Sequence, residues 1–500
     1  MSTTVTYKGS TLTTAENQTR TLKTAGKYME DDITIVDVTE SGTGNIYQDQ
    51  NGYLVLEDQG GNGSSSGGGS SRNMSDPIRF FDYDGTLVAS YSSVPASLPS
   101  VPTHAGLTSG TWNYTLQQVT TQFNAMGTCD VGANYDTVSG ATEIDIELRD
   151  GRLHPYLSLA VNGTVSIDWG DGSTPNTSTG TSLTSRKSDI HHEYAAAGSY
   201  TIKVSKTSGT GYSLYCTTAY SLLNKGSSTT GANRVYSSAV QSVRIGDDCA
   251  IGTYAFYACY SLTSASIPSS VTSIGSNAFN GCYSLASISI PSGVTGIGSN
   301  AFSNCYFLTS ASIPSTVTSI GDSAFNSCYA LASVSAPGGV ISIGSSAFSY
   351  CVSLVSVTIP STVTSIGDSA FYGCYSLASI SIPSGVTSIG SSAFQNCYSF
   401  ASIIIPSTVT SIGGNAFYGC YSLASISIPS GVTSIGTYAF VNCYGMAEYH
   451  FARTESVPTL GTSALNNIQS DCVIYVPSSK LNDYKTAENW STYASYMVGE

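Results

Sequence analysis

Residues 375–397 read YSLASISIPSGVTSIGSSAFQNC, and variants of this stretch recur through the second half of the 500-residue chain. The AF pair, the IG pair and the cysteine each return with a 23-residue period, nine times in all. A constant period of this length predicts structural units that stack on their neighbours. The periodic cysteines are Cys259, Cys282, Cys305, Cys328, Cys351, Cys374, Cys397, Cys420 and Cys443.

Each unit contains two short extended stretches and one compact turn. Ile288 and Ile290 alternate with serines, so they face inward with the two-residue period of a strand, and Pro291 ends that strand. VTSIG is the second extended stretch, and AFxxC is a turn that buries its Phe and Cys. One unit cannot bury its own apolar side, so the units stack in register. The period and the fixed Leu and Ile offsets predict a leucine-rich-repeat solenoid over residues 241–446.

The cysteine column has three interpretations: disulfides, a metal or redox site, or buried free thiols. Stacked neighbours have parallel Cα–Cβ bonds, so their Cβ atoms stay about one strand spacing apart, ~4.8 Å. That separation slightly exceeds the ~3.5–4.5 Å of a disulfide. We therefore expect mostly free cysteines that pack as small hydrophobic side chains.

The unit pattern C-x-x-L-x-x-I-x-I-P-x-x-V-T-x-I-G-x-x-A-F resembles the BspA-type leucine-rich repeats of surface-exposed adhesion proteins. The resemblance covers about residues 241–446 and implies a binding surface rather than an enzyme. The tail DCVIYVPSSKLNDYKTAENWSTYASYMV predicts a strand followed by a helix, and it resembles the C-terminal cap of such proteins. Residues 447–500 are therefore expected to cap the solenoid, whose end needs a polar outer face.

Residues 152–240 carry WGDG at Trp169–Gly172, followed by HEY at His192–Tyr194 and the segment GSYTIKV. This combination resembles a polycystic-kidney-disease (PKD) domain, an immunoglobulin-like sandwich that serves as a spacer in surface proteins. Asp168 and Asp171 are too few carboxylates to argue for a calcium site. The pair His191–His192 is likewise a weak candidate for a metal or catalytic site, so no metal or cofactor is expected.

Residues 1–59 are expected to form a compact domain, in which Asn51-Gly52 predicts a β-hairpin. The segment LKTAGKYMEDDITIVDV resembles small N-terminal domains of phage and prophage tail and fibre proteins. That resemblance implies attachment to another virion protein, and no signal peptide or membrane span is recognisable. Residues 60–76 follow as a flexible Gly/Ser-rich linker.

The stretch FFDYDGTLVAS at residues 80–90 matches the D-x-D-G-T-L motif of haloacid-dehalogenase-like phosphatases. In that family Asp82 would be the nucleophile and Asp84 the general acid, and Asp247 and Asp248 would be the metal-binding pair. However, Pro95, Pro99 and Pro102 exclude the helix that should follow the motif. We therefore expect residues 77–151 to be a module that contains a β-hairpin with an Asp84-Gly85 turn, and we expect no enzyme.

Charge limits the partners of the solenoid. The chain has a net charge of −14, which argues against nucleic acid and anionic membranes. Ile245–Ala452 contains no Lys or Arg at all. A surface this neutral recognises its partner by shape, stacking and uncharged hydrogen bonds.

Two surfaces of the solenoid are candidates for binding. The first is the strand face with serines at Ser287, Ser289, Ser310, Ser312, Ser333, Ser335, Ser379, Ser381, Ser425 and Ser427. The second is the edge formed by the residue after each cysteine, which is Val352 in one unit and tyrosine in the others. Tyrosine beside Asn, Ser and Gly is the composition of adaptable binding surfaces, although the rings also have a bracing interpretation in which they stack only on each other. The candidate ligand-binding residues are Tyr260, Tyr283, Tyr306, Tyr329, Tyr375, Tyr398, Tyr421 and Tyr444.

These patterns predict a mainly β protein: small N-terminal β-rich modules and an immunoglobulin-like sandwich, followed by a capped solenoid of nine 23-residue units. The expected function is non-enzymatic adhesion, with the solenoid bound to a host-surface glycan or protein and the chain mounted on a virion through residues 1–59. A bacterial cell-surface adhesin of the BspA type and a passive virion decoration are the alternatives. A homo-oligomer is left open.

Overall fold

The computed structural model describes residues 78–82, 87–104, 107–126, 129–137, 140–149, 152–187, 189–216, 222–224, 236, 238–336 and 338–500, together with short strands between residues 3 and 58. The chain divides into two compact units, residues 1–72 and residues 73–500. None of the described helices is long and apolar enough to cross a membrane.

The N-terminal unit contains only short antiparallel strands among its described residues. β1 (Thr3–Val5), β6 (Gly44–Gln48) and β7 (Leu54–Asp58) form one sheet in the order β1-β6-β7. β2 (Thr11–Thr13) pairs with β3 (Thr19–Thr21), and β4 (Tyr28–Glu30) pairs with β5 (Ile33–Ile35). The predicted hairpin around Asn51-Gly52 is confirmed by the antiparallel pairing of β6 and β7. The linker at residues 60–76 lies outside the described residues.

A small α/β module opens the second unit. It comprises β8 (Ile78–Phe81), β9 (Leu87–Tyr91), β10 (Leu107–Trp112), α1 (Leu116–Met126) and β11 (Cys129–Thr137), with sheet order β10-β11-β8-β9. The predicted hairpin is confirmed because β8 and β9 pair antiparallel. A reciprocal capping box starts α1, in which Thr115 N donates to Gln118 Oε1 at 2.7 Å and Gln118 N donates to Thr115 Oγ1 at 3.3 Å.

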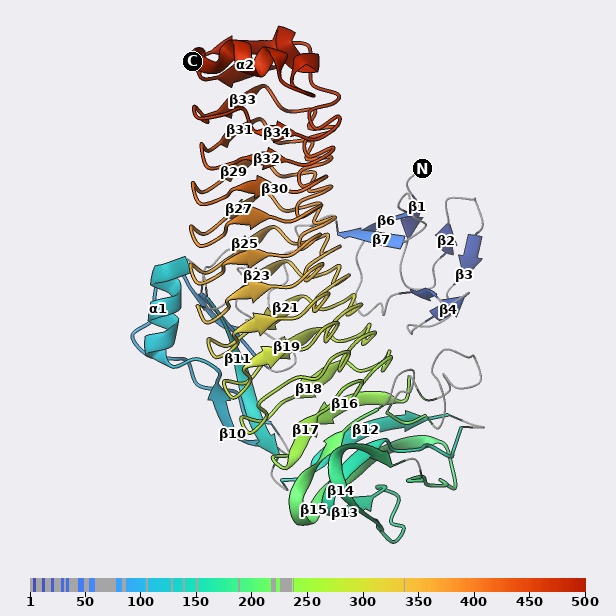
Figure 1. Ribbon diagram of the computed structural model, residues 1–500. Coiled ribbons are helices and arrows are strands. Elements are labelled where there is room, and N and C mark those ends of the chain that lie inside the picture. The colour runs from blue at the N-terminus through green and yellow to red at the C-terminus, as the bar shows by residue number, and fades with distance from the viewer. Residues whose placement is uncertain are drawn as a thin grey trace. The chain divides into compact units, whose positions relative to one another are not determined.

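A larger sheet joins this module to the solenoid. Its strands are β12 (Thr142–Leu148), β13 (Leu159–Asp168), β14 (Asn176–Lys187), β15 (Gly198–Leu214) and β16 (Val240–Arg244). The order is β14-β13-β15-β12-β16-β18, where β18 (Ser264–Ser266) already belongs to the first repeat. The sheet therefore continues into the solenoid without a break and covers its N-terminal end (Figure 1).

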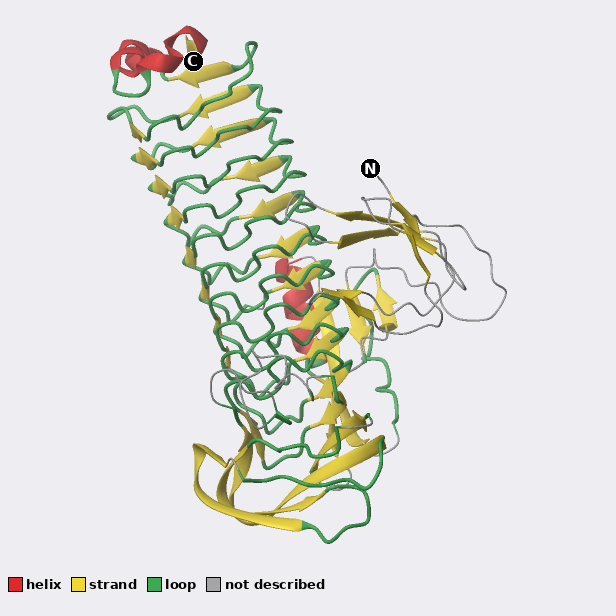
Figure 2. Cartoon of the chain, turned by 90° about the vertical axis from the view of Figure 1, so that its right-hand side faces the viewer, coloured by secondary structure: helices red, strands yellow, loops and turns green. Residues whose placement is uncertain are grey.

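The solenoid has about eleven turns, more than the nine periodic units (Figures 1 and 2). The expected mainly β fold, with a solenoid after small N-terminal β modules, is confirmed. One row of strands continues from β18 through β19 (Ser287–Ser289), β21 (Ser310–Ser312), β23 (Ser333–Ser335), β25 (Ser356–Thr358), β27 (Ser379–Ser381), β29 (Ser402–Ile404), β31 (Ser425–Ile428), β33 (Glu448–Phe451) and β35 (Val473–Val476). A second row contains β17 (Cys249–Ile251), β20 (Gly296–Ile297), β22 (Ser319–Ile320), β24 (Ser342–Ile343), β26 (Ser365–Ile366), β28 (Ser388–Ile389), β30 (Ser411–Ile412), β32 (Ser434–Ile435) and β34 (Thr459–Leu460). Partners within the repeats are parallel and keep the period of the sequence, as Ile320 and Ile343 do.

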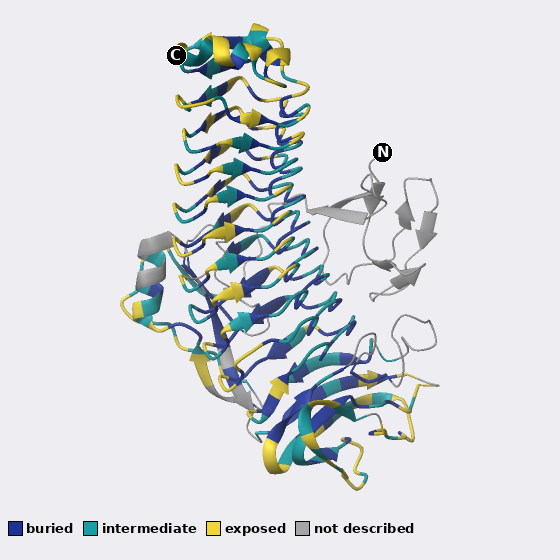
Figure 3. Ribbon diagram, viewed as in Figure 1, coloured by how far each residue is buried: buried dark blue, intermediate teal, exposed yellow. Residues whose placement is uncertain are grey.

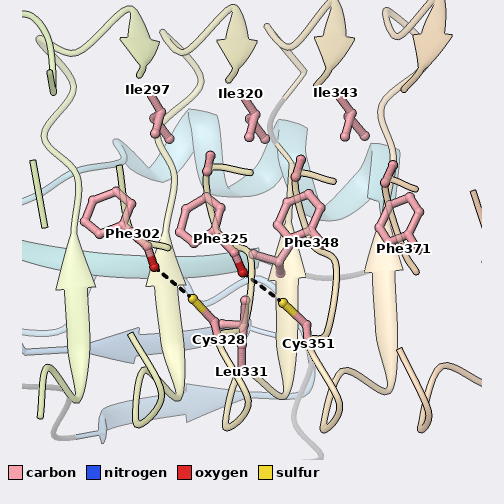
Figure 4. Packing of buried hydrophobic residues seen from close by; sticks show 14 of the residues in the cluster. Ile297, Phe302, Ile320, Phe325, Cys328, Leu331, Ile343, Phe348, Cys351 and Phe371 are labelled. Atoms are coloured by element: carbon pink, nitrogen blue, oxygen red, sulfur yellow. Dashed lines mark hydrogen bonds between the residues drawn. The ribbon is translucent and has the colours of Figure 1, made fainter. Parts of the chain in front are cut away.

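The core of the solenoid is a set of identical columns (Figure 4). The buried phenylalanines stack face to face, with ring centroids 5.2 Å apart for Phe302 and Phe325. Each periodic cysteine from the second onward donates its thiol to the Phe carbonyl of an earlier turn, as Cys328 Sγ does to Phe302 O at 3.2 Å. All thirteen cysteines are free, buried thiols, and burial raises the pKa of the Cys443 thiol to about 12. Cysteine recurs because it is a small hydrophobic side chain that also donates a weak hydrogen bond.

The C-terminal end closes the apolar column. The two rows of strands continue past residue 446 through β33, β34 and β35, and the chain then forms α2 (Leu481–Thr486), η3 (Ser491–Tyr496) and β36 (Met497–Gly499). The prediction of a strand followed by a helix is confirmed by β35 and α2. Trp490 is fully buried and its Nε1 donates to Pro458 O at 2.7 Å, which fixes the cap to the last turn.

Candidate functional site

The eight candidate tyrosines lie together along one edge of the solenoid. They form two stacks of four, Tyr260–Tyr329 and Tyr375–Tyr444, separated at Val352. Adjacent ring centroids are 4.6 Å apart for Tyr283 and Tyr306 and 5.5 Å apart for Tyr421 and Tyr444. Because the strand spacing of ~4.8 Å sets this distance, each inner ring contacts a ring on both faces. The rings are half-buried along most of the column, and only Tyr421 and Tyr444 are exposed.

Aromatic residues also flank the interruption at Val352. Tyr350 and Tyr372 make an edge-to-face contact, with ring centroids 5.0 Å apart and planes at 74°. Burial raises the pKa of the Tyr350 hydroxyl, and hydrogen bonding to Tyr372 raises it further. Tyr350 is also held at a left-handed backbone angle, φ 58°. The sequence showed the missing ring in the column, but not that Tyr350 and Tyr372 lie beside it.

The tyrosine rings stack less regularly at the C-terminal end of the column. Tyr398 and Tyr421 are nearly parallel, with planes 2° apart, whereas Tyr421 and Tyr444 differ by 26°. Tyr444 is 49% exposed, and its hydroxyl donates to Asn442 Oδ1 at 3.1 Å. Asn467 Nδ2 donates to the same oxygen. This end of the column thus combines an exposed ring with side-chain amides.

The serine face is covered over its first half by the module of residues 78–137. Asn113 Nδ2 donates to Ser312 Oγ at 2.9 Å, and Tyr114 donates its hydroxyl to Ile313 O at 2.8 Å. A side chain at Gly132 of β11 would collide with Ser289 and Ser312, so the backbone of β11 lies directly on the serines. The sequence did not reveal this cover, because the contacting residues lie far apart in the chain.

Further along the same face, the serines are exposed (Figure 3). Ser287 and Ser289 are buried, whereas Ser379 and Ser381, at the equivalent positions in β27, are exposed. Ile404 takes the place of a serine in β29 and is 83% exposed. Thus the predicted serine face is not uniform: Ser287, Ser289, Ser310 and Ser312 are buried, whereas Ser379, Ser381, Ser425 and Ser427 are exposed.

The phosphatase-like motif forms a buried anchor. Asp82 is 5% exposed, and its Oδ2 lies 2.8 Å from His104 Nε2. Its Oδ1 accepts a hydrogen bond from the Tyr135 hydroxyl at 2.8 Å. Both carboxylate oxygens are therefore engaged in hydrogen bonds that link His104, at the end of the proline-rich segment, to Tyr135 of β11.

The remaining parts of a phosphatase site are not assembled around Asp82. Asp84 lies outside the described residues. Asp248 forms an ion pair with Lys206 on β15, with Oδ1 and Nζ 2.5 Å apart. Within the part of the chain that the structure describes, no three His, Cys, Asp or Glu side chains are grouped to hold a metal ion.

The WGDG and HEY motifs, at Trp169–Gly172 and His192–Tyr194, meet in space. The His192 ring stacks on Trp169 with centroids 5.1 Å apart, and Tyr194 donates its hydroxyl to Trp169 O at 2.8 Å. His192 Nε2 lies 2.7 Å from Asp171 Oδ2. Burial alone would raise the pKa of Asp171, but hydrogen bonds from Ser173 and His192 outweigh it and lower the pKa to about 2. Asp171 and His192 therefore brace the WGDG turn, while Asp168 caps its own turn by accepting from Gly170 N at 2.9 Å.

Comparison with known families identifies the repeat type. The family described as BspA type leucine rich repeat region matches residues 249–378 and 364–485, in six copies. The repeats of residues 249–485 are therefore similar to BspA-type leucine-rich repeats. No curated protein matches the chain.

Three solved structures are similar to parts of this chain. A leucine-rich repeat protein from Bacteroides ovatus is 24% identical over 51% of this chain and 77% of its own, with a TM-score of 0.34. A leucine rich cell surface protein from Faecalibacterium prausnitzii is 29% identical over 43% of this chain and 80% of its own, with a TM-score of 0.26. A T. pallidum leucine rich repeat protein is 28% identical over 37% of this chain and 83% of its own, with a TM-score of 0.30.

Proposed function

We propose that this protein is a non-enzymatic adhesin or receptor-binding protein, whose solenoid binds a host-surface glycan or protein through the tyrosine column. The observation that supports this most is the column itself, which lines one edge of a solenoid without a Lys or Arg between Ile245 and Ala452. Tyrosine supplies contact area at low entropic cost because it has few rotatable bonds. A neutral ligand suits such an edge better than an acidic one, because the edge offers uncharged hydroxyls and amides.

The rest of the chain fits a supporting role. The sheet of β12–β16, with its PKD-like WGDG turn, is proposed as a spacer that also seals the apolar end of the solenoid. Residues 1–59 are proposed to attach the chain to another virion protein, on the strength of their resemblance to phage fibre domains. The repeat type supports the alternative of a bacterial cell-surface adhesin, and a passive virion decoration is the third assignment.

A triple substitution tests whether the tyrosine column binds a ligand or only stabilises the solenoid. Tyr306, Tyr329 and Tyr375 are changed together to Ser, and both the melting temperature and binding to host cells are measured on the full chain. We expect binding to be lost at temperatures where the variant remains folded. Binding that survives in the folded variant, together with a lowered melting temperature, would assign the column a structural role only.

The place of action needs a separate experiment. Mass spectrometry of purified virions and immunogold labelling of particles and cells, side by side, locate the protein. Detection in virions supports the proposal, whereas detection on intact cells alone supports the cell-surface adhesin. A protein found in virions that binds no host cell would be a passive decoration.

A further inference from the structure

A bulge interrupts β14, the edge strand of the sheet that joins the module to the solenoid. β13 and β14 pair antiparallel, and Val161 of β13 lies opposite Ser182 (Figure 1). The preceding residue of β13, Ala160, lies opposite Arg186, so three residues of β14 fall between two successive residues of β13. Thr184 N donates to Ser182 Oγ at 3.2 Å, which closes a local turn within the bulge. Bulges of this kind bend the strand and redirect its side chains.

A pocket of about 350 Å³ lies at this bulge. Small-molecule sites span roughly 300–1,000 Å³, so the pocket has room for one small ligand. Four residues of its lining carry hydroxyl groups, one carries an amino group, and none is acidic. The lining comprises Val161, Thr179, Gly180, Thr181, Ser182, Ser185 and Lys187. This composition suits a small ligand rich in hydroxyl groups better than an apolar one.

Lys187 supplies the one positive charge in the lining. Among the described residues, its amino group forms no ion pair and no hydrogen bond. The neighbouring Arg186 is engaged elsewhere, because its Nε donates to Ser158 Oγ at 3.1 Å and its Nη2 to Asn224 O at 3.4 Å. An ammonium group beside uncharged hydroxyls favours an anion, and a single charge matches a ligand with one negative charge.

Gly180 makes room for the lysine side chain. A Cβ atom at this position would lie 3.1 Å from Lys187 Cε and would collide with Val161 O. The aliphatic part of Lys187 therefore lies across Gly180, within the lining of the pocket. The bulge and this glycine together place the cation among the hydroxyls of β14.

We propose that this pocket binds one acidic sugar residue, a uronic acid or a sialic acid, through its carboxylate and its hydroxyls. Lys187 pairs with the carboxylate, while the side chains of Thr179, Thr181 and Ser185 exchange hydrogen bonds with the sugar hydroxyls. A phosphate dianion would meet a single ammonium group and no arginine fork, so the carboxylate is the better match. This site goes beyond the proposed function, because it lies outside the tyrosine column and takes an acidic ligand.

Saturation-transfer NMR titrations of the full chain test the site with three methyl glycosides: glucuronide, N-acetylneuraminate and glucoside, the last of which has no carboxylate. We expect an acidic glycoside to bind at least about tenfold more tightly than methyl glucoside, as the gain of a charge-assisted hydrogen bond implies. Lys187→Gln should weaken that binding by a similar factor, whereas Lys187→Arg, which keeps the charge, should retain it. Thr181→Val should also weaken it, because the variant lacks the hydroxyl. Lys485→Gln is the matched control, since Lys485 of α2 is likewise half-buried, and it should bind like the unmodified chain.

Several outcomes would overturn this assignment. Unchanged binding of the acidic glycosides to Lys187→Gln, or equal binding of methyl glucoside and methyl glucuronide, would exclude the carboxylate contact. Inorganic phosphate that binds more tightly than either acidic glycoside would show an oxyanion site without preference for a sugar. Loss of acidic-glycoside binding in the triple variant of Tyr306, Tyr329 and Tyr375 would place the contact on the tyrosine column instead. If neither acidic glycoside binds the unmodified chain, this inference fails, and the role of the tyrosine column is still decided by binding to host cells.

Discussion

Replacing Asn113 with Ala tests how residues 78–137 are held on the solenoid. The Asn113 side chain is 3% exposed, donates to Ser312 Oγ at 2.9 Å and Ile290 O at 3.2 Å, and accepts from Gly132 N at 2.9 Å. Only the bonds to Ser312 and Ile290 join the module to the solenoid, because Gly132 belongs to the module itself. Each buried hydrogen bond contributes about 1 kcal/mol net, so Asn113→Ala should weaken docking of the module by about 2 kcal/mol. At about 1.4 kcal/mol per factor of ten, this raises the undocked population roughly thirtyfold.

Hydrogen exchange followed by mass spectrometry measures this effect directly. Amides of β11 should exchange roughly thirtyfold faster in Asn113→Ala, because they are exposed when the module opens locally, while the solenoid amides are unchanged. Asn482→Ala, at an exposed position of α2, is the control and should exchange like the unmodified chain. Exchange of β11 within about twofold of the control would refute the view that Asn113 fixes the module, since twofold is only ~0.4 kcal/mol.

Two further predictions concern the C-terminal end and the turns. His450 Nδ1 lies 3.1 Å from Glu500 Oε2, and its Nε2 lies 3.3 Å from Glu448 Oε2. Burial lowers the pKa of His450, but these two hydrogen bonds outweigh burial and raise the pKa above its ordinary value of 6.5. Because the pKa of His450 is higher in the folded chain than in the unfolded chain, this stabilisation is complete below about pH 6.5 and is lost as the pH rises through the folded pKa. The melting temperature should therefore decline between about pH 6 and 8, and Glu500→Gln should reduce that decline. Ser346 has φ 56°, a backbone conformation in which a side chain is strained. Ser346→Gly should therefore stabilise the chain by about 0.5–1 kcal/mol in denaturant unfolding. Ser376→Gly is the control at a position without positive φ, and it should destabilise the chain by about 0.5–1 kcal/mol. The His450 account would be contradicted if Glu500→Gln left the pH dependence of the melting temperature unchanged. The account of the turn would be contradicted if Ser346→Gly and Ser376→Gly changed the free energy of unfolding equally.

The 23-residue period was sufficient to predict most of the solenoid. Ile288, Ile290 and the periodic Phe and Cys were expected inside, and all are buried. Such predictions succeed because a stacked repeat contacts mainly its neighbours, so one pattern determines the same contacts in every turn. The same logic placed the eight tyrosines on one edge.

The period did not predict the angle or exposure of each ring. It also did not predict how the chain continues after Tyr444, because the pairing of Ile435 with Leu460 departs from the regular spacing. The two strand rows therefore continue past residue 446, where the regular pattern stops.

Only the tertiary structure showed what covers the solenoid and what the D-x-D-G-T-L motif does. Asn113 and Ser312 are far apart in the chain, and neither residue belongs to a pattern that includes the other. The carboxylate of Asp82 is engaged by His104 and Tyr135, which come from two later segments of the chain. Contacts of this kind depend on how separate modules pack, so they leave no periodic trace in the sequence. The repeat determines the scaffold, while long-range packing decides which part of its surface is left for a ligand.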